Sequence, residues 1–216
     1  MPVNQPLGYI KNIKELFDSS RSKKISKGQI ILYQDDPVTE VFFVRSGYVK
    51  AYLILESGET RTMFILGRND LFPISFSMAT SWADDKIKYF YEAMSDVETC
   101  TLSTADLKLR TERDPHMTTS LLSYMAHANE SVIELLESTK TKSAADKVIA
   151  TLKYIAGKLG SERPGGVYKM DIKLSHQEIA DICGTTRETV SVAIKSLEKK
   201  KLVKITGDRL ALNLNE

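Results

Sequence analysis

Residues 174–197 constrain this chain more than any other segment, because they have the pattern of two short helices joined by a tight turn. Ser175 followed by Glu178 is a capping-box pattern, which begins a helix. Gly184 is suited to end that helix, since glycine readily takes the left-handed conformation common at helix ends. One of the two threonines that follow can cap a second helix. The segment therefore predicts a helix-turn-helix.

The second predicted helix has distinct inner and outer faces. Arg187, Glu188 and Ser191 lie on the outer face. In a DNA-reading helix-turn-helix, the N-terminal residues of the second helix lie against base edges. An ordinary helical hairpin with a solvated charged face would have the same spacing, so the neighbouring sequence has to separate the two interpretations. The apolar residues that recur at helical spacing and are expected to point inward are Val190, Ala193, Ile194 and Leu197.

The residues after the second helix favour DNA binding. Alternating segments at 203–205 and 210–212 flank Gly207-Asp208, which is a hairpin signal. A helix-turn-helix followed by a small hairpin is a winged helix. The net charge of the whole chain is only +2, but residues 195–209 contain six basic and two acidic side chains. A charge run is usually a solvated face; next to this motif, we expect it to lie along DNA phosphates.

The sequence around the turn resembles a known family. Residues 184–191, Gly-Thr-Thr-Arg-Glu-Thr-Val-Ser, are similar to the recognition helix of the CRP/FNR family of bacterial transcription regulators, and residues 177–180 and 197–199 fit the same pattern. A looser pattern extends through the N-terminal half. The resemblance implies an α+β fold, with an N-terminal antiparallel β-roll or jelly roll, a long dimerisation helix and a C-terminal winged helix-turn-helix. It also implies a cytoplasmic transcription activator that acts as a homodimer on a palindromic operator in double-stranded DNA and contacts RNA polymerase.

The DNA-binding residues follow from the motif and from side-chain chemistry. Arg187 is suited to pair with a guanine edge, and Glu188 can accept a hydrogen bond from a cytosine amino group. Val192 stands where the resembling family often has an arginine, so we expect it to touch a thymine methyl group instead. The predicted set is Ser175, Thr186, Arg187, Glu188, Ser191, Val192, Lys195, Lys200 and Lys201.

The first hundred residues have the pattern of an all-β domain. Short β-rich runs recur at regular spacing with turn residues between them, which indicates a β-barrel or jelly roll. We therefore expect a β-roll sensor at residues 1–112, a dimerisation helix at 113–140 and the winged helix-turn-helix domain at 141–216. Within the last part, the glycine-rich residues 160–166 are expected to form a loop.

The region that would hold an effector departs from the cyclic-AMP-binding members of the resembling family. Those members carry Gly-Glu and Arg-Ser pairs, which align here with Pro73-Ile74 and Ile87-Lys88. A phosphate needs a charged partner such as arginine, and isoleucine offers none, so cyclic AMP is not the expected effector. The residues expected to line the site are Phe72, Ile74, Phe76, Trp82, Lys88 and Tyr89. They either surround a hydrophobic effector or fill the barrel themselves, and we favour the filled barrel.

A long amphipathic helix is expected to start at Asp114-Pro115. One apolar stripe recurs with spacings of three and four, as in a coiled coil, and is the predicted dimer seam: Leu121, Met125, Ala128, Val132 and Leu135. The same stripe would also suit packing against the chain's own barrel. Leu122, Ile133 and Leu136 are placed to make that second contact.

Composition argues against several other classes of protein. No apolar run approaches the roughly 20 residues of a membrane helix, so no membrane association is expected. Cys100 and Cys183 are too few for an iron–sulfur cluster and are expected to be packing residues rather than redox sensors. Residues 20–110 contain no histidine, which argues against a cupin-like metal enzyme. We expect no enzyme activity and no cofactor, and leave the effector unassigned. The alternative function is a regulatory module that binds a cyclic nucleotide or another small molecule and acts on a protein partner.

Overall fold

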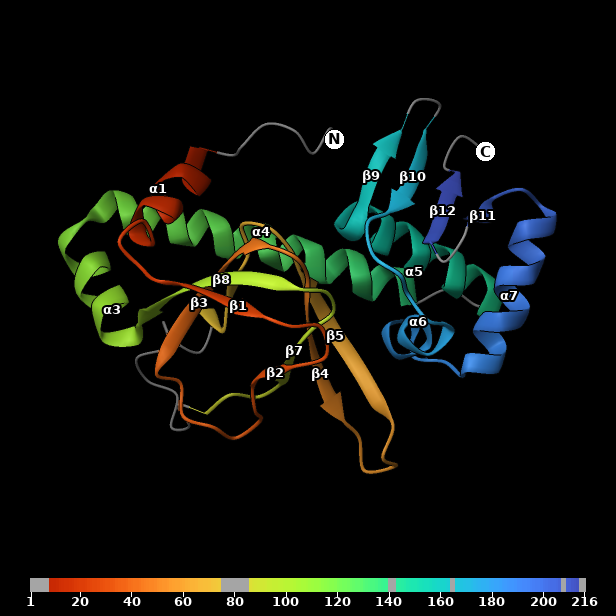
Figure 1. The fold of residues 1–216 in the computed structure, drawn as a ribbon, viewed down its shortest axis with the longest axis horizontal. Coiled ribbons are helices and arrows are strands. Elements are labelled where there is room, and N and C mark those ends of the chain that lie inside the picture. The colour runs from red at the N-terminus through yellow and green to blue at the C-terminus, as the bar shows by residue number, and fades with distance from the viewer. Residues whose placement is uncertain (1–7, 75–85, 140–142, 164–165, 207–208, 214–216) are drawn as a thin grey trace. The chain divides into compact units, whose positions relative to one another are not determined.

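The computed structural model describes residues 8–74, 86–139, 143–163, 166–206 and 209–213 (Figure 1). They form two compact units, residues 1–51 with 66–131 and residues 52–65 with 132–216. The elements up to the long helix are α1 (Gly8–Leu16), β1 (Ser22–Ile25), β2 (Ile30–Leu32), β3 (Glu40–Ser46), β4 (Val49–Ile54), β5 (Thr60–Leu66), β6 (Leu71–Phe72), β7 (Phe90–Ala93), β8 (Val97–Ser103), α3 (Thr104–Arg113) and α4 (Pro115–Thr139).

Two sheets make up the N-terminal β-rich half. Their strand orders are β1-β8-β3-β6 and β2-β7-β4-β5. In the first sheet β3 pairs with β8 antiparallel, from Glu40 opposite Ser103 to Val44 opposite Thr99. Residues 41–44 of β3 are all buried, because this central strand is covered on both faces. The predicted α+β fold with antiparallel N-terminal sheets is confirmed.

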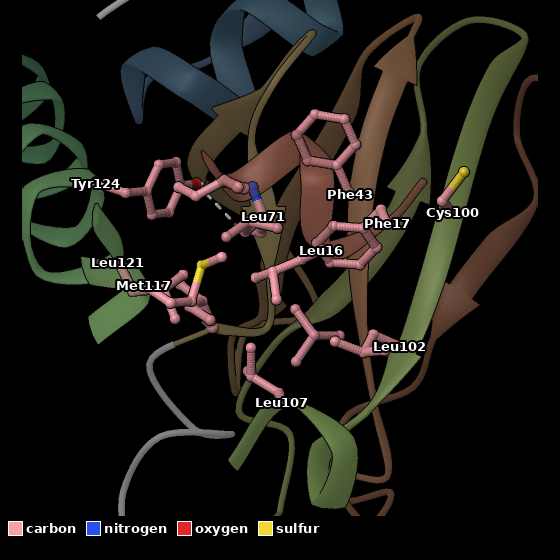
Figure 2. Close-up of a cluster of buried hydrophobic side chains, with 13 residues drawn as sticks. Leu16, Phe17, Phe43, Leu71, Cys100, Leu102, Leu107, Met117, Leu121 and Tyr124 are labelled. Atoms are coloured by element: carbon pink, nitrogen blue, oxygen red, sulfur yellow. Dashed lines mark hydrogen bonds between the residues drawn. The ribbon is translucent and has the colours of Figure 1, made fainter. Parts of the chain in front are cut away.

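Helices α1, α3 and α4 cover one face of the sheet that contains β3 and β8. Phe17, just after α1, stacks on Phe43 of β3 with ring centroids 5.3 Å apart. Leu121 of α4 and Leu107 of α3 are buried in the same cluster, which Figure 2 shows between the α4 helix and the strands. Each such buried side chain contributes roughly 1.5–3 kcal/mol relative to exposure, so this cluster holds the helices on the sheet.

The C-terminal half combines three helices with a small sheet. Its elements are α5 (Ala144–Leu159), β9 (Gly160–Arg163), β10 (Val167–Met170), α6 (His176–Cys183), α7 (Arg187–Lys199), β11 (Val203–Thr206) and β12 (Arg209–Asn213). The sheet has the order β11-β12-β10-β9, and all its pairs are antiparallel. The expected loop at 160–166 is therefore wrong for residues 160–163, which pair with β10. Local composition favoured a loop, but a strand partner satisfies these backbone groups.

Candidate nucleic-acid interface

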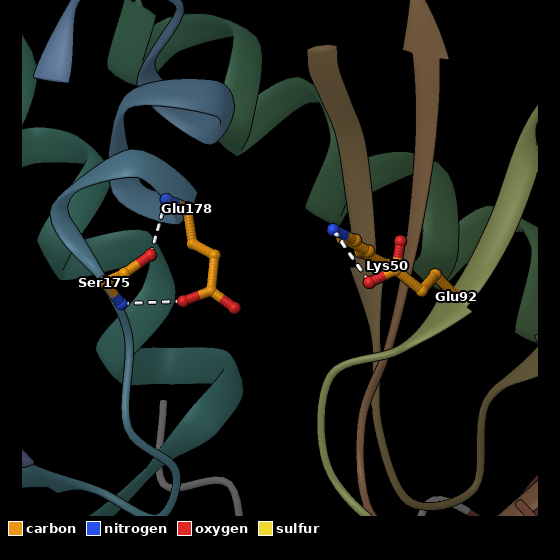
Figure 3. Close-up of polar contacts among 4 residues, drawn as sticks. All are labelled: Lys50, Glu92, Ser175 and Glu178. Atoms are coloured by element: carbon orange, nitrogen blue, oxygen red, sulfur yellow. Dashed lines mark hydrogen bonds and ion pairs between the residues drawn. The ribbon is translucent and has the colours of Figure 1, made fainter. Parts of the chain in front are cut away.

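The first helix of the motif begins with the predicted capping box (Figure 3). The Ser175 hydroxyl accepts a hydrogen bond from Glu178 N at 3.1 Å, and the Glu178 carboxylate accepts one from Ser175 N at 2.6 Å. The helix ends at Gly184, whose φ of 65° is left-handed. Its N–H donates to Ala180 O at 2.7 Å. The predicted start and end of α6 are confirmed, and both depend on contacts within ten residues.

The turn leads into α7 through a second cap. Of the two threonines, Thr186 is the N-cap, and its hydroxyl accepts from Thr189 N at 3.2 Å. Lys147 of α5 donates to Gly184 O at 3.3 Å and so satisfies a carbonyl at the end of α6. The four predicted inward residues of α7 are all buried. The second helix is thereby held at a defined angle with its N-terminal turn outward.

The outer face of α7 presents the predicted reading residues to solvent. Arg187, Glu188 and Lys195 are exposed, and Val192 is 70% exposed. Thr186 is exposed at the N-cap, but its hydroxyl is already hydrogen-bonded. An exposed valine among charged side chains is unusual for a helix that only faces water, and it suits contact with an apolar group such as a thymine methyl.

Basic side chains continue past the C-terminal end of α7. Lys200 and Lys201 are exposed, and Lys201 has a φ of 61°, which ends the helix. The wing follows as β11 and β12, paired from Val203 opposite Leu212 to Thr206 opposite Arg209. The predicted hairpin is confirmed, while its tip at Gly207-Asp208 lies outside the described residues.

Ser191 does not present a free hydroxyl for base reading. The side chain is half-buried, and its oxygen lies 2.8 Å from Nδ1 of His176 and 2.9 Å from Arg187 O. Ser175 is exposed, but its hydroxyl is engaged in the cap. Sequence reasoning missed His176 as a partner of the reading helix. No local pattern pointed to this contact, because His176 and Ser191 lie fifteen residues apart across the turn.

Aromatic side chains are stacked between the two sheets of the β-roll. Phe72 is 1% exposed and stacks on Phe42 at 5.1 Å and on Tyr91 at 5.0 Å. Burial raises the pKa of the Tyr91 hydroxyl. Lys50 and Glu92, on neighbouring strands of the second sheet, form an ion pair at 3.2 Å (Figure 3). Polar and aromatic groups of this region are thus largely engaged with one another.

The predicted effector residues separate into buried and surface positions. Phe72 and Ile74 are buried, as is Ile87, which sequence comparison sets against the arginine of the cyclic-AMP-binding members. Lys88 is exposed and Tyr89 is half-buried. Phe76 and Trp82 lie outside the described residues. The one lysine of the predicted set, whose charge would suit a phosphate, therefore lies at the surface.

Both cysteines are buried and free. The guanidinium of Arg45 donates from Nε to Sγ of Cys100 at 2.7 Å, and that hydrogen bond raises the pKa of Arg45. Cys183 lies in the buried face of α6. Among the residues that the structure describes, no three His, Cys, Asp or Glu side chains are grouped as metal ligands would be. No helix within the described ranges is long and apolar enough to cross a membrane.

The structure contradicts the predicted dimer seam on α4 at one position, Leu121. Leu121 is 0% exposed and sits in the chain's own core cluster, with Met125 and Ala128 packed against it. Leu135 is also buried and Val132 is half-buried. A side chain with no exposed area cannot bury more against a second molecule, so Leu121 is available for the chain's own packing alone.

A neighbouring stripe on α4 faces solvent instead. Leu122 is 67% exposed, Ile133 45% and Leu136 54%, and the smaller Ala126 and Asn129 between them are exposed as well. These five residues are spaced 4, 3, 4 and 3 apart, which is a coiled-coil repeat. The leucine and isoleucine side chains that were expected to contact the barrel are the exposed ones. The two stripes lie one residue apart, so the side of α4 that faces the sheet decides which large side chains are buried and which stay exposed.

Tyr124 anchors α4 to the short strand β6. The Leu71 N–H donates to its hydroxyl at 2.8 Å, and that hydroxyl donates to Leu71 O at 3.2 Å (Figure 2). The hydroxyl also lies 3.5 Å from Oδ1 of Asp70. Burial first, and the nearby Asp70 carboxylate second, raise the pKa of Tyr124 well above its ordinary value. The tyrosine is therefore neutral and able to donate.

The chain is similar to known proteins over most of its length. Residues 22–112 match the cyclic nucleotide-binding domain family, and residues 146–215 match the Crp-like helix-turn-helix domain family. The global nitrogen regulator of Synechocystis sp. is 24% identical over 201 residues, which are 93% of this chain and 84% of the relative. The anaerobic regulatory protein of Haemophilus influenzae is 23% identical over 97% of this chain and 77% of its own length.

Solved structures share the fold. FixK2 from Bradyrhizobium japonicum superposes with a TM-score of 0.75 at 21% identity, covering 91% of this chain and 93% of that one. A CRP-family transcriptional regulator from Thermus thermophilus has a TM-score of 0.72 at 19% identity, covering 88% and 91%. At these sequence identities, both comparisons show a shared fold.

Proposed function

Because the chain belongs to the CRP/FNR family of transcription regulators, we propose that it binds a palindromic operator as a homodimer and reads it with the N-terminal half of α7. The observation that carries this proposal is the outer face of α7, where Arg187, Glu188 and Val192 are exposed while the opposite face is buried. The caps at Ser175 and Thr186 fix that face without using Arg187 or Glu188.

The dimer is proposed to form along the exposed stripe of α4, from Leu122 to Leu136. A two-fold protein matches the two half-sites of a palindrome. Asn129 sits in the middle of the stripe, and one polar residue at such a position sets register in coiled coils at some cost in stability. Pairing of this stripe with its twin would bury the large apolar side chains that the single chain leaves in water.

Base reading is proposed to rest on three residues of α7. Arg187 donates to a guanine edge, Glu188 accepts from the paired cytosine, and Val192 touches a thymine methyl. Lys200 and Lys201 add contacts to phosphates, which bind all sequences alike. Ser191 leaves this set, because its hydroxyl is already shared between His176 and Arg187 O.

The β-roll is proposed to be filled by its own side chains near Phe72, so that cyclic AMP does not bind. The stack of Phe42, Phe72 and Tyr91 and the buried Ile74 and Ile87 support this. None of these side chains can pair with a phosphate. RNA polymerase is the further partner proposed, on family membership alone.

The test is a binding selection from random DNA, followed by measurement of the affinity for the selected site. We expect a palindrome whose half-sites lie about one helical turn apart. Selection of a single half-site, with one chain bound to it, would contradict the dimer. No enrichment of any sequence would contradict sequence-specific binding itself.

A further inference from the structure

His176 joins the two helices of the DNA-binding motif through a chain of hydrogen bonds. It is the first residue of α6, and its Nδ1 lies 2.8 Å from the Ser191 hydroxyl of α7. That hydroxyl donates to Arg187 O at 2.9 Å. Since a hydroxyl carries one hydrogen, Ser191 then accepts at its oxygen, and His176 must carry a proton on Nδ1.

The second ring nitrogen is therefore the group that can change. Nε2 is on the opposite edge of the imidazole from Ser191, and the residue keeps part of its surface in solvent. With Nδ1–H held by Ser191, Nε2 is an acceptor when the ring is neutral and a donor when it is charged. No acidic side chain forms an ion pair with His176 among the residues that the structure describes.

The charges around the ring differ between the free and the DNA-bound protein. On α6 itself the Glu178 carboxylate is occupied by Ser175 N. On α7, Arg187 and Glu188 carry opposite charges in the first turn. On α5, Lys147 is bound at Gly184 O, at the far end of α6.

DNA adds negative charge at this place, because the first helix of a helix-turn-helix crosses the sugar-phosphate backbone. We propose that His176 takes up a proton when operator DNA binds and donates Nε2–H to a phosphate oxygen, so that operator affinity depends on pH. This rests on the proposed DNA-binding function of α6 and α7. The complex then holds more protons than the free partners, so affinity is greatest at low pH and falls as pH rises. Histidine is the side-chain type that ordinarily changes charge between about pH 5 and 8.

Operator affinity measured between about pH 6 and pH 8, over a range of salt at each pH, tests the proposal. The wild type is expected to bind roughly tenfold more weakly at the higher pH. Its logarithmic salt dependence should be steeper at the lower pH by about one per subunit, because one more phosphate is neutralised.

The matched variant is His176→Asn. The asparagine amide keeps an N–H donor for Ser191 but cannot become charged. We expect it to bind operator with a salt dependence that no longer changes with pH. His116→Asn and His127→Asn replace the other two histidines, both on α4, and should retain the wild-type pH profile.

The outcomes separate the proposal from the DNA-binding function on which it rests. A pH profile in His176→Asn that equals that of the wild type, or a flat profile in the wild type, overturns the role of His176. Failure of the wild type to bind any selected DNA overturns the DNA-binding function instead. If His176→Asn does not fold, the nitrogen NMR signals of the wild-type ring decide: the second ring nitrogen should stay protonated to a higher pH in the complex than in the free protein, and equal behaviour in the two would overturn the proposal.

Discussion

The helix-turn-helix and the interior of the β-roll are stabilised over very different distances along the chain. The former is defined by contacts such as Ser175 with Glu178 and Thr186 with Thr189, each three residues apart. The latter is assembled from Phe42, Phe72 and Tyr91, which belong to three separate strands. Local contacts allow the reading face to vary without unfolding the domain. A substitution in the stack is expected to be less well tolerated, because its rings hold together strands that lie far apart in the sequence.

The largest effect is expected in the stack. Phe72→Ala removes a buried ring between two others and should lower the free energy of unfolding by roughly 3–5 kcal/mol. Urea unfolding followed by circular dichroism measures it. The control is Tyr33→Ala, which removes a 53% exposed ring that meets Phe90 edge-on and should change stability by less than about 1 kcal/mol. Equal losses of unfolding free energy in the two variants would mean that the stack contributes no more to stability than an exposed aromatic pair.

The next effect concerns association through α4. Ile133→Asp places a charge in the exposed stripe and should weaken the dimer by roughly 3 kcal/mol, with little change in the fold of the single chain. Sedimentation at micromolar concentration measures it. Leu109→Asp, an exposed apolar position on α3, should leave the dimer intact. If the Ile133→Asp protein is still a dimer, the exposed stripe is not the dimer interface, and the stripe that contains Val132 is again the candidate.

Base reading should show a smaller effect that depends on sequence. Arg187→Ala is expected to weaken operator binding by roughly 1–3 kcal/mol per half-site and to relax the preference at one base pair. Lys200→Ala is the contrast, because it should weaken binding to all sequences alike and flatten the salt dependence. Selection with both variants distinguishes the two roles. An unchanged consensus for Arg187→Ala would remove this residue from base reading.

The capping box should account for about 1 kcal/mol. Ser175→Ala deletes the hydroxyl that accepts from Glu178 N and should lower the stability of the C-terminal domain by that amount. Thermal unfolding is sufficient to detect it. Ser196→Ala, on the exposed side of α7, should have no measurable effect. A loss of more than about 3 kcal/mol at Ser175 would show that this helix start depends on more than its local cap.

No effect at all is expected when cyclic AMP is added. Ile74 and Ile87 are buried where the binding members of the family have a glutamate and an arginine. Calorimetric titration should therefore give no binding heat at physiological concentrations. Micromolar affinity would show that the roll interior rearranges around a ligand. The roll would then not be more rigid than the helix-turn-helix.

Sequence reasoning succeeded where local contacts decide the structure. The caps of α6, the inward face of α7 and the wing follow from residue types a few positions apart. Turn residues indicated that the first hundred residues form short strands, but they did not give the pairing order, because partners such as β3 and β8 lie far apart in the sequence. The parts at 1–112, 113–140 and 141–216 stay predictions.

The failures have the same origin. Strand β9 looked like a loop because glycine and serine carry weak strand preference, and its partner β10 decided otherwise. On α4, Leu121 and Leu122 belong to equally apolar stripes, and a small rotation of the helix determines which one is buried. Ser191 looked free because its partner His176 lies fifteen residues earlier, across a turn whose angle no local pattern specifies.

Leu71 and Phe72 are consecutive residues that contact two different parts of the fold. The peptide of Leu71 is gripped on both its N–H and its C=O by Tyr124 of α4, while the next side chain, Phe72, is wedged between two rings inside the roll. In mechanical terms, one residue of the strand is fixed to α4 and the next is fixed to the interior of the roll. The roll interior and α4 are thus mechanically coupled. A shift of either one is transmitted to the other, or it breaks the Tyr124 hydrogen bonds or the ring stack at Phe72.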